Sequence, residues 1–75
     1  MTTALRSSEE GIVYSGSYEC EGHNVSFIIL TGDRVKIIEY NQSGSSSHSS
    51  ERIEVLDSAI KLQDRLIQLG YDKVS

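Results

Sequence analysis

Disulfides are excluded within this chain of 75 residues, because Cys20 is its only cysteine. A metal cage built from Cys and His would have only Cys20, His23 and His48 to draw on, whereas structural zinc normally takes four ligands. A chain this short buries little apolar area per residue and usually needs a disulfide, a metal or oligomerisation for stability. We therefore expect oligomerisation to supply that stability.

Long apolar runs and basic segments are missing as well. No stretch approaches the roughly 20 apolar residues that a membrane helix needs, and the polar segment MTTALRSSEEG does not resemble a secretory signal. Seven Lys and Arg residues against eleven Asp and Glu give a net charge of −4, which argues against binding to nucleic acid. We expect a small acidic protein of the reducing cytoplasm that does not associate with membranes.

The densest apolar region is NVSFIILTGDRVKIIEY, residues 24–40. Its two halves are rich in β-branched residues and flank Gly32-Asp33, a pair typical of the two-residue turn of a β-hairpin. Residues 11–20 alternate as a half-buried strand does, and Gly16 weakens that strand. The sequence therefore predicts an antiparallel meander of at least three strands.

The second half of the chain changes character twice. Residues 41–50, NQSGSSSHSS, contain no apolar residue and predict a mobile, serine-rich loop. Residues 51–55 suit either a fourth strand or the start of a helix, and we favour the strand because Asp57-Ser58 provides a fresh N-cap. Apolar residues at helical spacing then predict a helix that ends at Gly70 in a Schellman motif.

These elements together predict an α+β fold, in which a C-terminal helix packs on one face of an antiparallel, three- to four-stranded meander. The single domain spans residues 11–71. Flexible tails at residues 1–10 and 72–75 flank it.

A single helix covers only one face of a sheet, so the other face carries the functional prediction. A two-residue turn at Gly32-Asp33 would gather the aromatic residues on one face, to which we assign the helix. The opposite face would then expose an aliphatic patch worth roughly 1.5–3 kcal/mol per fully buried side chain. The patch residues are Ile28, Leu30, Val35 and Ile37. We expect a symmetric homodimer through this face or through a sheet edge.

Catalytic, cofactor-binding and metal-binding sites are not predicted. The segment from Cys20 to His23 has C-x-x-H spacing, but a cysteine at a strand end and a histidine in a turn explain it better than a zinc site or a thiolate–imidazole pair. The serine-rich segment lacks the lysine of a phosphate-binding loop.

The sequence thus favours a small, non-enzymatic, homodimeric module that binds proteins or has a regulatory role. The alternative is a protein that binds single-stranded nucleic acid by stacking bases on an aromatic sheet face. That face would carry Tyr14, Tyr18, Phe27 and Tyr40. Lys36 would be its only basic residue, and this scarcity of positive charge counts against the alternative.

Overall fold

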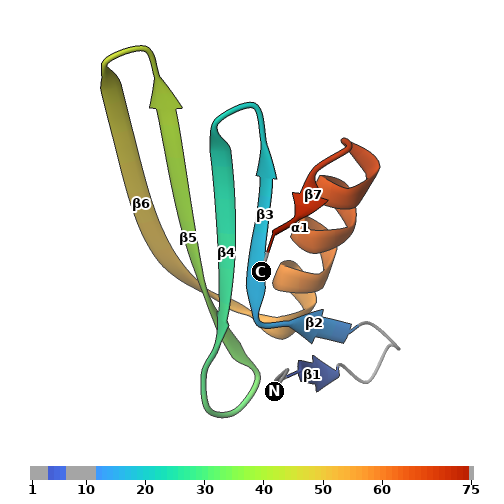
Figure 1. Ribbon diagram of the computed structural model, residues 1–75. Coiled ribbons are helices and arrows are strands. Elements are labelled where there is room, and N and C mark those ends of the chain that lie inside the picture. The colour runs from blue at the N-terminus through green and yellow to red at the C-terminus, as the bar shows by residue number, and fades with distance from the viewer. Residues whose placement is uncertain (1–3, 7–11, 75) are drawn as a thin grey trace.

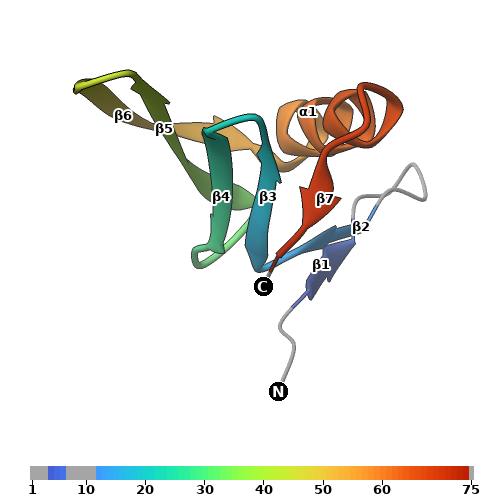
Figure 2. The same ribbon diagram turned by 45° about the horizontal axis from the view of Figure 1, so that its top comes forward.

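A computed structural model describes residues 4–6 and 12–74. Its elements are β1 (Ala4–Arg6), β2 (Ile12–Tyr14), β3 (Gly16–Cys20), β4 (His23–Ile29), β5 (Arg34–Ser43), β6 (Ser46–Val55), α1 (Leu56–Gln68) and β7 (Asp72–Lys73). Five strands form an antiparallel sheet in the order β6-β5-β4-β3-β7, and β1 pairs separately with β2 (Figure 1). The helix packs on one side of the larger sheet (Figure 2). The predicted α+β class is confirmed, with more strands than expected.

The predicted strand at residues 11–20 is divided at Ser15 into β2 and β3, which belong to different sheets. The other additional strands, β1 and β7, come from segments that the sequence predicted as tails. Residues 4–6 pair with β2, and residues 72–73 pair with β3 at the sheet edge. The predicted loop at 41–50 is instead a hairpin, because β5 runs on to Ser43 and β6 starts at Ser46. A β-ladder is closed by main-chain hydrogen bonds, so polar residues join it without any apolar pattern. The rest of the predicted N-terminal tail and Ser75 lie outside the described residues.

The turn between β4 and β5 is one residue longer than the sequence predicted. The Leu30 N–H donates to the Arg34 carbonyl over 3.0 Å, so residues 31–33 form a three-residue turn. Successive side chains of a strand point to opposite faces, so a shift of one residue moves every side chain of β5 to the other face. The predicted division of the sheet into faces is therefore wrong for β5.

The corrected register brings Val35 and Ile37 of β5 onto the face on which the helix packs. Ile37 pairs with Phe27, and Val35 pairs with Ile29. Val35 and Ile37 are 0% and 1% exposed, so they belong to the covered face, the face on which α1 packs. Two of the four predicted patch residues therefore belong to the core.

Residues 21–24 are also typical of a turn, and a turn at Gly22-His23 would pair Cys20 with Val25. The observed register of β3 and β4 differs from this prediction by two residues. Glu21 and Gly22 occupy the turn with positive φ values of 50° and 85°, the pattern of a tight type I′ turn. Cys20 consequently pairs with His23, and Tyr18 pairs with Val25. A shift of two residues changes partners but preserves faces, so the predicted faces of these two strands are correct.

The helix follows β6 without an intervening loop. Residues 51–55 are strand, as favoured, but α1 starts at Leu56, ahead of the predicted cap. The Leu56 N–H donates to the Asp33 carbonyl over 2.7 Å, so the β4–β5 turn provides an acceptor for one of the N–H groups at the start of the helix. At the other end, Gly70 has φ +92°, and the Tyr71 N–H donates to the Leu66 carbonyl over 3.0 Å. This bond confirms the predicted Schellman motif.

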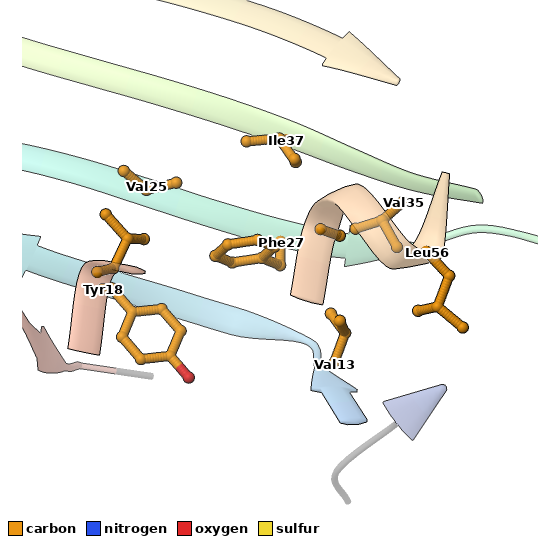
Figure 3. Packing of buried hydrophobic residues seen from close by; sticks show 9 residues of the cluster. Val13, Tyr18, Val25, Phe27, Val35, Ile37 and Leu56 are labelled. Carbon is orange, nitrogen blue, oxygen red and sulfur yellow. The ribbon is translucent and has the colours of Figure 1, made fainter. Parts of the chain in front are cut away.

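The core lies between the covered face and α1 and also includes β2 (Figure 3). The rings of Tyr18 and Phe27 meet edge to face, with centroids 5.8 Å apart. The buried apolar residues are Val13, Tyr18, Val25, Phe27, Val35, Ile37, Leu56, Ala59 and Leu66. Every strand from β2 to β5 contributes to this cluster, so one small core holds the fold together.

Candidate functional site

The sheet face turned away from α1 is the main candidate site, and we call it the open face. Residues directly opposite each other in neighbouring strands share a face, so the register defines the row Ile28, Lys36 and Ile53. Neighbouring rows on the same face add Ile38, Tyr40 and Val55. Four of these side chains are large and exposed: Ile28 43%, Tyr40 40%, Ile53 53% and Val55 44%. The open face is thus an aliphatic surface with one tyrosine.

Charge on the open face is mixed in sign. The Lys36 ammonium lies 4.0 Å from a Glu51 carboxylate oxygen, which joins β5 to β6. An exposed pair of this kind contributes roughly 0–1 kcal/mol, so it marks a polar border more than it adds stability. A hollow of about 330 Å³ lies beside it, lined by Lys36, Glu51, Arg52 and Ile53. An apolar surface bordered by both signs of charge suits a protein surface better than a polyanion.

The predicted patch of Ile28, Leu30, Val35 and Ile37 does not exist as a single surface. Ile28 lies on the open face and Leu30 is half-buried beside the β4–β5 turn, while Val35 and Ile37 are in the core. The prediction missed Ile38, Tyr40, Ile53 and Val55. The alternation of Ile53 and Val55 with charged residues could have revealed that pair.

The aromatic platform proposed for nucleic-acid bases is also dispersed. Tyr18 and Phe27 are buried in the core, whereas Tyr40 lies on the open face and Tyr14 lies in β2. The Lys73 ammonium sits 5.1 Å from the centroid of the Tyr14 ring. The four rings therefore do not form a common stacking surface.

The outer edge of β6 adjoins the open face. In the order β6-β5-β4-β3-β7, β6 is terminal, and no strand among residues 4–6 and 12–74 pairs with its outer side. Both ribbon views place this edge at the end of the sheet opposite β7 (Figures 1 and 2). Its residues are exposed except for the half-buried Glu54. An edge of ten residues offers main-chain donors and acceptors to another strand.

A series of polar side-chain contacts crosses the covered face beyond the end of the core. The Tyr71 hydroxyl lies 2.5 Å from His23 Nδ1, and His23 Nε2 lies 3.3 Å from Glu39 Oε1. The other oxygen of Glu39 accepts a hydrogen bond from Arg52. This bond, aided by the charges of Arg52 and His23, lowers the pKa of Glu39 although partial burial opposes it. These contacts link β4, β5 and β6 to the segment after α1.

The predicted C-x-x-H pair now has a defined geometry. Cys20 and His23 face each other across the β3–β4 hairpin, and His48 lies in the same row two strands further on, roughly 10 Å from His23 by strand spacing. Both ring nitrogens of His23 already have partners, the Tyr71 hydroxyl and the Glu39 carboxylate. Across the described ranges, no three His, Cys, Asp or Glu side chains are grouped to hold a metal ion.

Comparisons with known proteins give no family for this chain. No family model, curated protein or solved structure matches it. Within the described part of the chain, no helix has the length and apolar character needed to cross a membrane. The functional argument therefore depends on the surface itself.

Proposed function

We propose that this chain is a small, non-enzymatic module that binds protein and whose first partner is a second copy of itself. The contact surface is the open side of the sheet, meaning the open face together with the outer edge of β6. The exposure of Ile28, Tyr40, Ile53 and Val55 on one face carries the proposal. Contiguous apolar surface of this kind is typical of interaction sites.

The core supplies the energetic reason for association. Only nine apolar residues of the described chain are buried, and no disulfide is available, so the isolated domain has a narrow margin of stability. Burial contributes about 25 cal/mol per Å² of apolar surface removed from water. A contact that buries exposed apolar side chains of the open side, such as Ile53 and Val55 of β6, therefore adds stability to a weakly stabilised monomer.

The charge pattern favours a second copy over a partner of one charge sign. The open face carries the cation Lys36 beside the anion Glu51, and Arg34 and Val55 pair at its border. A surface with both signs is complementary to itself under a two-fold axis, which maps each patch onto its own partner. A strongly basic or acidic ligand would gain nothing from this arrangement.

Sedimentation or light scattering across micromolar concentrations tests the proposal. The native chain should be dimeric at tens of micromolar, and Ile53→Lys should shift it to a folded monomer because a desolvated ammonium opposes contact. Leu69→Lys is the matched control, since Leu69 is 61% exposed at the end of α1, outside the proposed surface. That variant should remain a dimer.

Two results would contradict the proposal. One is a native chain that stays monomeric and well folded throughout the concentration range. The other is equal dissociation by Ile53→Lys and Leu69→Lys, which would mean that added charge, and not the open side of the sheet, controls association.

A further inference from the structure

We infer that two copies pair through β6 in one antiparallel register, with Ile53 opposite Ile53 of the partner subunit. This inference rests on the proposed homodimer and specifies its geometry. The two five-stranded sheets would join edge to edge into one continuous sheet. The open faces would lie side by side on the same surface of that sheet.

Symmetry restricts the registers that are available. In an antiparallel ladder the two-fold axis is perpendicular to the sheet and passes between two directly opposite residues. Two identical chains can therefore pair symmetrically only if some residue faces its own copy. The registers of β6 are then distinguished by which residue that is.

Charge selects among these registers. Centring the ladder on Glu51, Arg52 or Glu54 places two like charges directly opposite each other, which destabilises a strand pair. A register in which one of the residues 46–50 faces its own copy pairs mostly neutral side chains. Only the register centred on Ile53 places each Arg52 opposite the partner's Glu54. Two charge-complementary pairs would then flank one β-branched pair.

The geometry of β6 fits this register. Arg52 and Glu54 belong to rows of the covered face, and Ile53 belongs to the open face, so polar and apolar pairs separate onto opposite sides. The ladder would span residues 51–55 and end where α1 begins at Leu56. Because the row Ile28, Lys36 and Ile53 reaches the β6 edge, the two copies would join these rows through the pair of Ile53 side chains.

Cysteine cross-linking tests the register directly. In a Cys20→Ser background, Ile53→Cys should form an intersubunit disulfide under mild oxidation, since opposite residues in an antiparallel ladder have Cα atoms about 4.5–5.5 Å apart. Val55→Cys is the control, because each Val55 would face the partner's Glu51 and lie roughly 13 Å from its own copy. Cross-linking of Ile53→Cys should be at least about tenfold faster than that of Val55→Cys.

A charge exchange provides an independent measurement. Glu54→Lys and Arg52→Glu should each weaken self-association, because each homodimer would contain two like-charge pairs. Arg52→Glu also removes the bond to Glu39 of the same chain, a loss that mixing with a second variant does not restore. An equimolar mixture of the two variants should recover dimers, since both pairs in the heterodimer are then opposite in charge. Circular dichroism of each variant confirms that it remains folded, and Asp64→Lys, at an exposed position on α1 outside the proposed surface, controls for the change in net charge.

The outcomes separate this inference from the proposal on which it rests. A dimer that shows neither the Ile53→Cys preference nor recovery in the mixture would overturn the register and leave the homodimer intact, for example with the open faces packed together. A native chain that is monomeric at every concentration would overturn both. Rapid Ile53→Cys cross-linking with recovery in the mixture would support both.

Discussion

Phe27 and Ile28 are neighbours in β4, yet Phe27 is 1% exposed and Ile28 is 43% exposed. The same contrast separates the buried Ile37 from the half-buried Ile38 in β5. Composition does not distinguish the two faces, because both carry large aliphatic residues. The covered face has a helix to pack against, whereas the open face has none within the described chain. Burial in this sheet is therefore decided by register and by the position of α1.

Among the substitutions that test this contrast, Ile37→Lys should lower the stability of the fold most. The side chain lies in the core, so the variant would place an unpaired ammonium there at a cost of roughly 4 kcal/mol or more. Small domains have only about 5–15 kcal/mol in total, so we expect loss of cooperative unfolding in a thermal melt. Ile53→Lys on the open face should keep a cooperative transition. A folded Ile37→Lys variant would contradict the register that pairs Ile37 with Phe27 on the covered face.

Alanine substitutions at the neighbouring positions 27 and 28 should lower the free energy of unfolding by unequal amounts. Phe27→Ala removes a fully buried ring and should lower the free energy of unfolding by about 3–5 kcal/mol. Ile28→Ala should lower it by about 1 kcal/mol or less at concentrations where the chain is monomeric. Urea denaturation of both variants provides the measurement. Equal losses would imply that the open face is covered within the monomer.

The polar end of the covered face should respond to acid. Glu39 has a lowered pKa in the folded state, so its contribution is present above its ordinary value of 4.5 and is lost as pH falls through the folded value. Glu39→Gln should cost roughly 1 kcal/mol at neutral pH and should flatten the loss of stability in the acidic range. Urea midpoints measured from neutral pH down to pH values below 4.5 test this. Parallel pH profiles for both chains would exclude the role of Glu39.

The smallest expected effect is a difference between two glycine substitutions, one of them in the turn that keeps β3 and β4 in register. Gly22→Ala places a methyl group 3.1 Å from the Gln42 carbonyl oxygen at a φ of +85°, and should cost about 1–2 kcal/mol. Gly44→Ala is the matched control, since Gly44 also has positive φ but nothing lies within 4 Å of the added atom. The excess cost of Gly22→Ala, a few tenths of a kcal/mol, measures the close contact with β5. No difference would mean that only backbone conformation matters at Gly22.

The sequence was sufficient for the fold class and for the elements with apolar periodicity. Strands around Phe27 and Ile37 and the helix with its Gly70 end follow from patterns that packing itself imposes. The length of the turn before Arg34 could not be predicted from the sequence, because Gly32-Asp33 fits both a two-residue and a three-residue turn. This difference of one residue places the side chains of β5 on the opposite faces from those predicted. Val35 and Ile37, half of the predicted patch, therefore lie in the core.

The strands made of polar residues were also not predicted from the sequence. Residues 41–50 have no apolar side chain to reveal that they pair, and the two residues of β7 are too few to show a period. Their stability comes from main-chain hydrogen bonds, which leave no mark on composition. The general expectation of an apolar surface without a cover was independent of these details, although the residues that form it had to be revised.

The outer half of the β5–β6 hairpin projects beyond the rest of the sheet (Figure 1) and consists only of exposed residues from position 41 to 50. No buried side chain ties it to the core, so its opening free energy is lower than that of the whole domain. Amide hydrogens should therefore exchange fastest near Gly44 and progressively more slowly towards Val35. Because an isolated hairpin forms in roughly 1–10 μs, this arm can open from its tip and close again while the helix and the inner sheet stay folded.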